Sequence, residues 1–205
     1  MPLDFRDDRS YTSGMGRPSA REEIVQAGLK CLVEKGFNAV GVQDITDTAG
    51  VPKGSFYNHF ESKEALGVEI VERYGANQTR REILTDPSVP PLQRLRRHFD
   101  RISALFAESH FKRNCILGGF SAELANQSET IRESLRKLYG QWTKDIEATI
   151  AEAQTKGEIA NKTKASDLAA FLLDSYEGAL LRARVERSRK PFDRFMKFAF
   201  GQLLI

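Results

Sequence analysis

The residues best suited to catalysis or metal binding in this 205-residue chain are three histidines and two cysteines. The histidines stand at 59, 98 and 110, without the close pairing that a zinc site uses. The chain also lacks a glycine-rich phosphate loop and the Gly-x-Ser-x-Gly elbow of hydrolases. We therefore expect no catalytic residues, no metal site, no cofactor and no enzyme activity.

Cys115 is the residue with the clearest chemical potential. It stands at an expected helix start, close behind Lys112 and Arg113. A helix N-terminus and neighbouring cations stabilise a thiolate, so the position suits a reactive sensor. An inert side chain packed between helices is the competing and more frequent interpretation. Cys31 lies within an apolar stripe and is expected to be a core residue.

Composition and charge exclude several classes of protein. Apolar residues make up 40% of the chain, as in ordinary globular proteins. No apolar run reaches the ~18 residues that a membrane helix needs, the start does not resemble a secretory signal, and two distant cysteines form no disulfide framework. We therefore expect a cytoplasmic protein that does not enter a membrane. Residues 1–70 hold 8 Lys/Arg against 11 Asp/Glu, so any DNA binding there must depend on individually placed residues.

A longer helix is expected to lead the N-terminal part of the chain. It begins at Ser19, with Glu22 three residues later as in a capping box, and ends at Gly36. Its apolar stripe comprises Ile24, Gly28, Cys31 and Leu32. This helix can pack against the two shorter helical patterns that follow it.

Two shorter helical patterns follow, joined by a tight turn. Val42, Ile45 and Ala49 lie on one face of the first pattern, and Phe56 and Phe60 are expected to bury one face of the second. Gly50 permits the positive backbone angle of a tight turn, and Pro52 suits the first position of the next helix. Ser62 is expected to cap the helix after that. The pattern of two short helices packed against a longer one indicates a helix-turn-helix motif. The second helix of this motif enters the major groove of DNA.

The stretch "GVQDITDTAGVPKGSFYNHFESKEAL" resembles the DNA-binding segment of the TetR-type bacterial transcriptional regulators. The resemblance covers residues ~20–66 and includes the Ala-Gly-Val turn, Lys-Gly-Ser, Tyr-x-His-Phe and Ser-Lys-Glu-Ala-Leu. Val42 departs from it, because the family often has a capping Ser or Thr there, whose loss costs about 1 kcal/mol.

Seven residues are the expected DNA contacts: Gln43, Lys53, Gly54, Ser55, Tyr57, His59 and Lys63. The resemblance implies that those between 53 and 57 meet the major groove or its flanking phosphates. It implies that His59 and Lys63 contact the DNA backbone.

The chemistry of these residues supports the same assignment. Gly54 has no side chain, so the helix can approach the bases closely. The Gln43 amide can pair with adenine, and Lys63 adds charge to a helix N-terminus that already favours phosphate. Each residue alone also has an ordinary explanation, such as packing for Tyr57 or solvation for Lys53. Their order together favours DNA binding.

The remaining chain is expected to be helical near 63–84, 91–109, 116–126, 129–156, 165–188 and 191–203. The expected organisation is all-α, with a flexible arm at 1–17, the helix-turn-helix domain at 18–64 and a ligand-binding and dimerisation domain at 65–205. The last segment is apolar on more than one side, which indicates a subunit interface. The resemblance likewise implies a homodimer formed through 165–188 and 191–203.

The resemblance also implies a pocket for a small-molecule effector among the central helices. The candidate ligand or sensor residues are His98, Phe106, Trp142, Tyr176 and Cys115, with Phe171 as a further lining residue. Aromatic residues at helical spacing are more often core, and the basic run at 94–101 is more often a solvated face.

Residues 115–124, with "AQTKGEI" and "YEGAL", resemble one subgroup of the family. Some of its members repress reductase or detoxification genes and respond to electrophiles or oxidants through a cysteine at this point. The sequence therefore predicts a dimeric, ligand-responsive regulator on a near-palindromic operator. A repressor is the expected form and an activator stays open. The alternative is a DNA-binding helical dimer without an effector.

Overall fold

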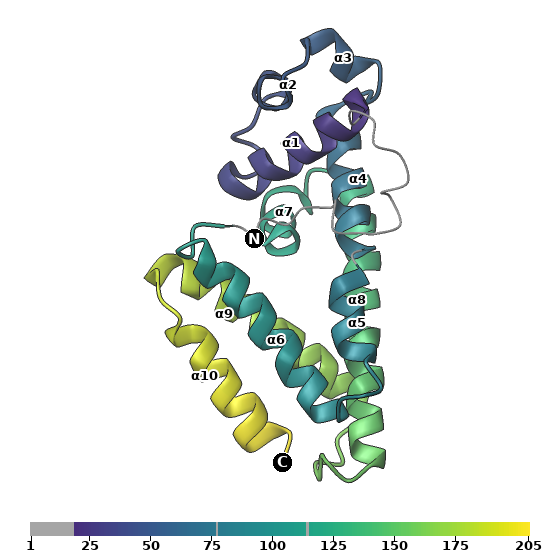
Figure 1. Ribbon diagram of the computed structural model, residues 1–205, viewed down its shortest axis with the longest axis vertical. Helices are drawn as coiled ribbons and strands as arrows, with labels where there is room; N and C mark the ends of the chain where they lie inside the picture. Colours follow the sequence, from purple (N-terminus) through teal and green to yellow (C-terminus); the bar gives the residue numbers. More distant parts are fainter. Residues whose placement is uncertain (1–18, 77, 114) are drawn as a thin grey trace. The chain divides into compact units, whose positions relative to one another are not determined.

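The computed structural model describes residues 19–76, 78–113 and 115–205, and every element in these ranges is a helix (Figure 1). The elements are α1 (Ala20–Lys35), α2 (Val42–Ala49), α3 (Lys53–Tyr57), α4 (Lys63–Gly75), α5 (Gln78–Thr85), α6 (Pro91–Glu108), α7 (Ile116–Leu124), α8 (Glu129–Thr155), α9 (Ala165–Glu186), α10 (Lys190–Phe198) and the π-helix η3 (Ala199–Leu203). The prediction of an all-α fold is confirmed. The predicted arm at 1–17 lies outside the described residues.

The chain divides into two compact units. The first contains the residues up to 77 together with 114–138, and the second contains 78–113 and 139–205. The first unit thus holds α1 to α4, α7 and the start of α8. The second holds α5, α6, the rest of α8, α9, α10 and η3. The division into domains at residue 65 stays a prediction.

Two predicted helices differ from the structure. The expected helix at 63–84 is broken after Gly75, and α5 begins at Gln78. Glycine and asparagine at 75 and 77 are poor helix formers, which accounts for the interruption. The expected helix at 191–203 begins at Lys190 and widens into η3 over its last five residues, where the Leu204 N–H bonds to the Ala199 carbonyl at 2.9 Å.

The core of the first unit is mainly aliphatic where α1 meets α2, α3 and α4. Its fully buried side chains include Ile24, Leu32, Ile45, Phe56, Leu66 and Ile70. Burial of each such side chain contributes about 1.5–3 kcal/mol. The predicted stripe of α1 is therefore correct, and it fixes the base on which α2 and α3 rest.

The core of the second unit contains a cluster of aromatic rings. The Phe99 ring lies 4.8 Å from that of Tyr176 and 5.0 Å from that of Phe195, and Tyr176 stacks on Phe192 at 5.7 Å. These contacts join α6, α9 and α10. Such edge and stacked pairs add about 0.5–1.5 kcal/mol each beyond their burial.

Candidate DNA-binding surface and regulatory residues

Charged pairs between α1 and α4 hold the base of the helix-turn-helix. Arg21 pairs with Glu69, and Arg73 pairs with both Glu69 and Glu22. Two of these pairs, Arg21–Glu69 and Glu22–Arg73, join the start of α1 to α4, and the third lies within α4.

The start of α1 is capped as predicted. Ser19 Oγ accepts from the Glu22 N–H at 3.3 Å. The Glu22 carboxylate accepts from Gln26 at 2.9 Å and from Arg73 at 2.6 Å. Burial raises the pKa of Glu22, but these hydrogen bonds outweigh it and leave the pKa below its usual 4.5.

The start of α2 differs from the prediction. Its N-cap is Gly41, and Val42 is the first helical residue. The Asp44 carboxylate accepts from the Gly41 N–H at 2.7 Å, which is half of a capping box. The cap that a Ser or Thr would have supplied is therefore replaced in part by Asp44.

The turn between α2 and α3 is built around Gly50. Its φ of 69° lies in the left-handed region that glycine adopts without strain. The Val51 N–H then bonds to the Thr46 carbonyl at 3.1 Å, which closes the turn. Pro52 is the N-cap of α3, one residue before the position predicted for it.

The outer face of α3 carries four of the predicted DNA contacts. Phe56 and Phe60 are buried as predicted, so Lys53, Gly54 and Tyr57 face outward and Ser55 is half-buried. The Tyr57 side chain is 55% exposed. A Cβ added at Gly54 would meet no atom within 4 Å, so this face is open to a large partner.

Gln43, in α2, and His59, shortly after α3, are both exposed. The Gln43 amide donates to Asp47 at 2.6 Å, one helical turn further along α2. That bond engages one of the two N–H groups of the amide. Their DNA contacts stay predictions.

Lys63 has a structural task that the sequence did not reveal. Its Nζ donates to the carbonyls of Phe37 at 2.9 Å and Val40 at 2.7 Å, in the turn between α1 and α2. Burial lowers the pKa of Lys63, while the charges of Glu123 and Asp44 act in the opposite direction. An ammonium has three donors, so one is left for the predicted phosphate contact.

The predicted effector residues of the second unit form a connected buried group. His98 is 1% exposed, and the Trp142 indole N–H donates to its Nε2 at 2.8 Å. Because an indole N–H can only donate, the Nε2 atom of His98 is the acceptor and carries no hydrogen. The Tyr176 hydroxyl bonds to Ser103 at 2.8 Å, and Phe106 is buried nearby in α6.

Phe171 does not join that group. It is exposed on α9 and lies on one helical face with Leu181 and Val185, which are exposed too. Its expected role in lining a pocket is therefore wrong, because the inward face of α9 is taken by Leu172, Leu173 and Tyr176.

Cys115 is the N-cap of α7, as its predicted place at a helix start requires. It is 8% exposed, and neither cysteine forms a disulfide. Cys115 belongs to the first unit, whereas the other effector candidates belong to the second. Cys31 is buried in α1, as expected.

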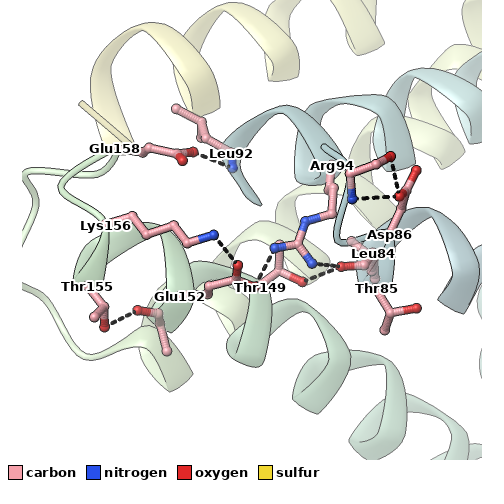
Figure 2. A network of polar contacts seen from close by, with 12 residues as sticks. Leu84, Thr85, Asp86, Leu92, Arg94, Thr149, Glu152, Thr155, Lys156 and Glu158 are labelled. Atoms are coloured by element: carbon pink, nitrogen blue, oxygen red, sulfur yellow. Dashed lines mark hydrogen bonds and ion pairs between the residues drawn. The ribbon is translucent and has the colours of Figure 1, made fainter. Parts of the chain in front are cut away.

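A polar network in the second unit was missed by sequence reasoning (Figure 2). Arg94 is 5% exposed and donates to the Leu84 carbonyl at 2.8 Å and to the Glu152 carboxylate. Hydrogen bonds from Lys156 and Arg94 lower the pKa of Glu152. The solvated face expected at 94–101 is thus wrong at Arg94, which ties α5 to α6 and α8.

The described residues were also compared with the requirements of a metal site and of a membrane-spanning helix. Among them, no group of three or more His, Cys, Asp or Glu side chains is placed to hold a metal ion. None of the described helices is both long and apolar enough to cross a membrane.

Comparisons with known proteins agree with this geometry. Residues 24–70 match the model of bacterial regulatory proteins of the tetR family, and residues 91–199 match that of a tetracyclin repressor-like C-terminal domain. The chain is 40% identical over 192 residues to the HTH-type transcriptional repressor DhaR of Mycobacterium sp. (strain GP1), covering 93% of this chain and 95% of the relative.

Solved structures show the same fold. A regulatory protein TetR from Rhodobacter sphaeroides superposes with a TM-score of 0.84 at 32% identity, covering 91% of this chain and 99% of that one. The reduced form of E. coli NemR gives 0.80 at 26% identity, covering 91% and 97%. These similarities confirm the predictions of a helix-turn-helix transcriptional regulator and of a protein that is not an enzyme.

Proposed function

Because the chain belongs to the TetR family of bacterial regulatory proteins, we propose that it is a cytoplasmic, homodimeric repressor released from a near-palindromic DNA operator by an effector. The observation that carries the proposal is the open outer face of α3. Lys53, Gly54 and Tyr57 point away from a core that fixes them. The face thus combines a positive charge, close access and an aromatic hydroxyl.

The proposed contacts divide into two kinds. Tyr57, His59 and Lys63 hold phosphates and set the position of the helix on DNA. Gln43 and Lys53 read base edges, since an amide pairs with adenine and a lysine with guanine. Gly54 and Ser55 keep α3 close enough for these contacts.

The proposed dimer forms through α9 and α10. Phe171, Leu181 and Val185 leave an apolar face of α9 exposed, and Phe198 is half-exposed on α10. A second copy of the chain is the proposed cover, as in the predicted interface at 165–188 and 191–203. The two α3 helices of such a dimer would meet the two half-sites of a near-palindrome.

The effector is proposed to act on one of two places. A small molecule would bind in the second unit beside His98, Phe106, Trp142 and Tyr176, where the polar atoms of the histidine, tryptophan and tyrosine can reorganise around a ligand. A reactive electrophile or oxidant would instead modify Cys115. The existence of a crystal structure of the reduced form of E. coli NemR supports modification of the thiol. A helical DNA-binding dimer without an effector is the remaining alternative.

The test is an anisotropy titration of the purified chain against labelled DNA from upstream of its own gene. Tyr57→Ala is expected to weaken binding to all sequences alike, and Gln43→Ala to change which sequence is preferred. Lys162→Ala, an exposed charge in the second unit, is the matched control and is expected to bind like wild type. Equal behaviour of all three variants would remove α2 and α3 from the proposed interface.

The effector is tested in the same assay with iodoacetamide as the thiol probe. Loss of DNA binding in wild type but not in Cys115→Ser supports modification of the thiol. If binding is insensitive to the probe in both proteins, Cys115 is not the sensor, and a reversible ligand of the second unit is proposed in its place.

A further inference from the structure

The turn between α1 and α2 is gripped from both sides by charged side chains of other helices. The Glu123 carboxylate of α7 accepts from the backbone N–H of Phe37 at 3.2 Å through Oε1 and of Asn38 at 2.7 Å through Oε2. Lys63 of α4 donates to the Phe37 and Val40 carbonyls of the same turn. The backbone N–H groups of this short stretch thus bond to a carboxylate, and its carbonyl groups bond to an ammonium.

The turn needs such partners because of how α1 ends. Gly36 has a φ of 89°, so the chain leaves the helix in a direction that exposes the next two N–H groups. A carboxylate accepts from both of them with one oxygen each, whereas an amide has an NH2 group in place of one of these oxygens. A Cβ added at Gly36 would lie 2.7 Å from Glu123 Oε1, so the glycine also makes room for the carboxylate.

Apolar contacts hold the same two elements together. The Phe37 ring is buried and meets the Phe120 ring of α7 edge to face at 5.4 Å. The Lys63 ammonium lies 4.2 Å from the centre of the Phe37 ring. The end of α7 and the turn therefore form a single packed contact within the first unit.

The chain enters the first unit from the second at residues 113/114, directly before α7. Helix α7 contains Gly118 and Gly119 in its interior, and glycine is the least favourable helix residue after proline. Its helical state therefore depends on its contacts, and the grip on the turn is one of them. Elements of low local stability are those that regulated proteins use to move.

We propose that Glu123, with Lys63, forms a clamp on the α1–α2 turn (residues 37–40) that fixes α2 and α3 for DNA binding, and that a change at the start of α7 is passed to the DNA-binding helices by loosening this clamp. Glu123 is a positioning residue, since it acts on DNA through the turn. This inference rests on the proposed function for its DNA readout, but the clamp itself can be measured without DNA.

The first experiment is hydrogen exchange of the free protein, followed in the peptide spanning residues 35–41. Glu123→Ala removes both acceptors. Glu123→Gln keeps one, because its amide nitrogen would face an N–H group. The matched control is Glu133→Gln, which changes the same charge in an exposed Arg136 pair of the same unit. The expected exchange rates rise in the order control, Gln, Ala, with about a tenfold increase or more for Ala, the rate change expected for loss of a local protecting bond.

The second readout is affinity for the DNA from upstream of the gene. Glu123→Ala is expected to bind about tenfold more weakly than Glu133→Gln, within the usual range of coupling between sites. Exchange at 35–41 that is unchanged in Glu123→Ala overturns the clamp, and faster exchange with unchanged affinity overturns its role in DNA binding. If wild type fails to bind any DNA, the proposed function falls while the exchange result still decides whether the clamp exists.

Discussion

Replacing Arg94 with methionine is expected to destabilise the second unit strongly, although arginine is usually a surface residue. Its guanidinium is buried between α5, α6 and α8 and donates to the Leu84 carbonyl and to Glu152 (Figure 2). Methionine has a similar length and no polar atoms that can replace these donors. The substitution therefore isolates the loss of the hydrogen bonds from a loss of volume.

The loss of unfolding free energy depends on which other donors remain for the Leu84 carbonyl and the Glu152 carboxylate. A hydrogen bond from a charged donor contributes about 1.5–3 kcal/mol, and the Leu84 carbonyl would lose one. Its other donor, Thr149 Oγ1, lies at 3.5 Å, the limit of a hydrogen bond. Glu152 keeps Lys156 at 2.8 Å and is partly exposed, so it adds little. The expected loss of unfolding free energy is about 2–3 kcal/mol in all.

Thermal unfolding at one fixed protein concentration measures this loss. For a domain of this size Tm falls by about 2–4 °C per kcal/mol, which predicts a decrease of roughly 4–12 °C. Arg97→Met is the control, because Arg97 is exposed on the same helix and should change stability by no more than about 0.5 kcal/mol. A Tm of Arg94→Met that matches the control would show that the buried guanidinium contributes no stability through these hydrogen bonds.

Three further predictions concern stability. Because the pKa of Glu22 is lowered in the folded protein, its ionisation contributes stability that is complete above pH 4.5 and is lost as the pH falls through the lowered value. Glu22→Gln should therefore reduce the acid-dependent loss of unfolding free energy, measured by urea unfolding above and below that pH, and an unchanged pH dependence contradicts this. Gly36→Ala should cost about 1–3 kcal/mol for a backbone of φ 89° and ψ 167°, which only glycine adopts readily, and more for its collision with Glu123; thermal unfolding close to wild type would be evidence against that strain. Trp142→Phe leaves the buried His98 acceptor without its indole donor and should cost about 1–3 kcal/mol, measured by circular dichroism because Trp142 is the only tryptophan; a neutral result would show that this bond adds nothing.

Local signals in the sequence were sufficient for α1, α2 and α3. Ser19, Gly36, Gly50 and the Phe56/Phe60 pair each act within a few residues of the chain, and each has the predicted role. The errors there are shifts of one position, as at Pro52, because a cap and the first helical residue share the same preferences.

Long-range partners could not be predicted in this way. Glu123 meets a turn more than 80 residues earlier, and Arg94 meets Glu152 58 residues later. Nothing in a helical pattern distinguishes a charge that will be buried against such a partner from one left in water. Phe171 shows the converse, because an aromatic residue at helical spacing can lie on an outer face.

The central claim is that the outer faces of α2 and α3 bind one DNA sequence in preference to others. The most direct measurement is the ratio of dissociation constants for DNA from upstream of the gene and for shuffled DNA of the same composition, at one physiological salt concentration. The expected ratio is at least about 10³, as for specific DNA-binding proteins, and it is expected to be lost in a Lys53→Ala, Tyr57→Ala double variant that unfolds like wild type. A ratio near one in wild type, or a ratio that the double variant keeps, would contradict the claim.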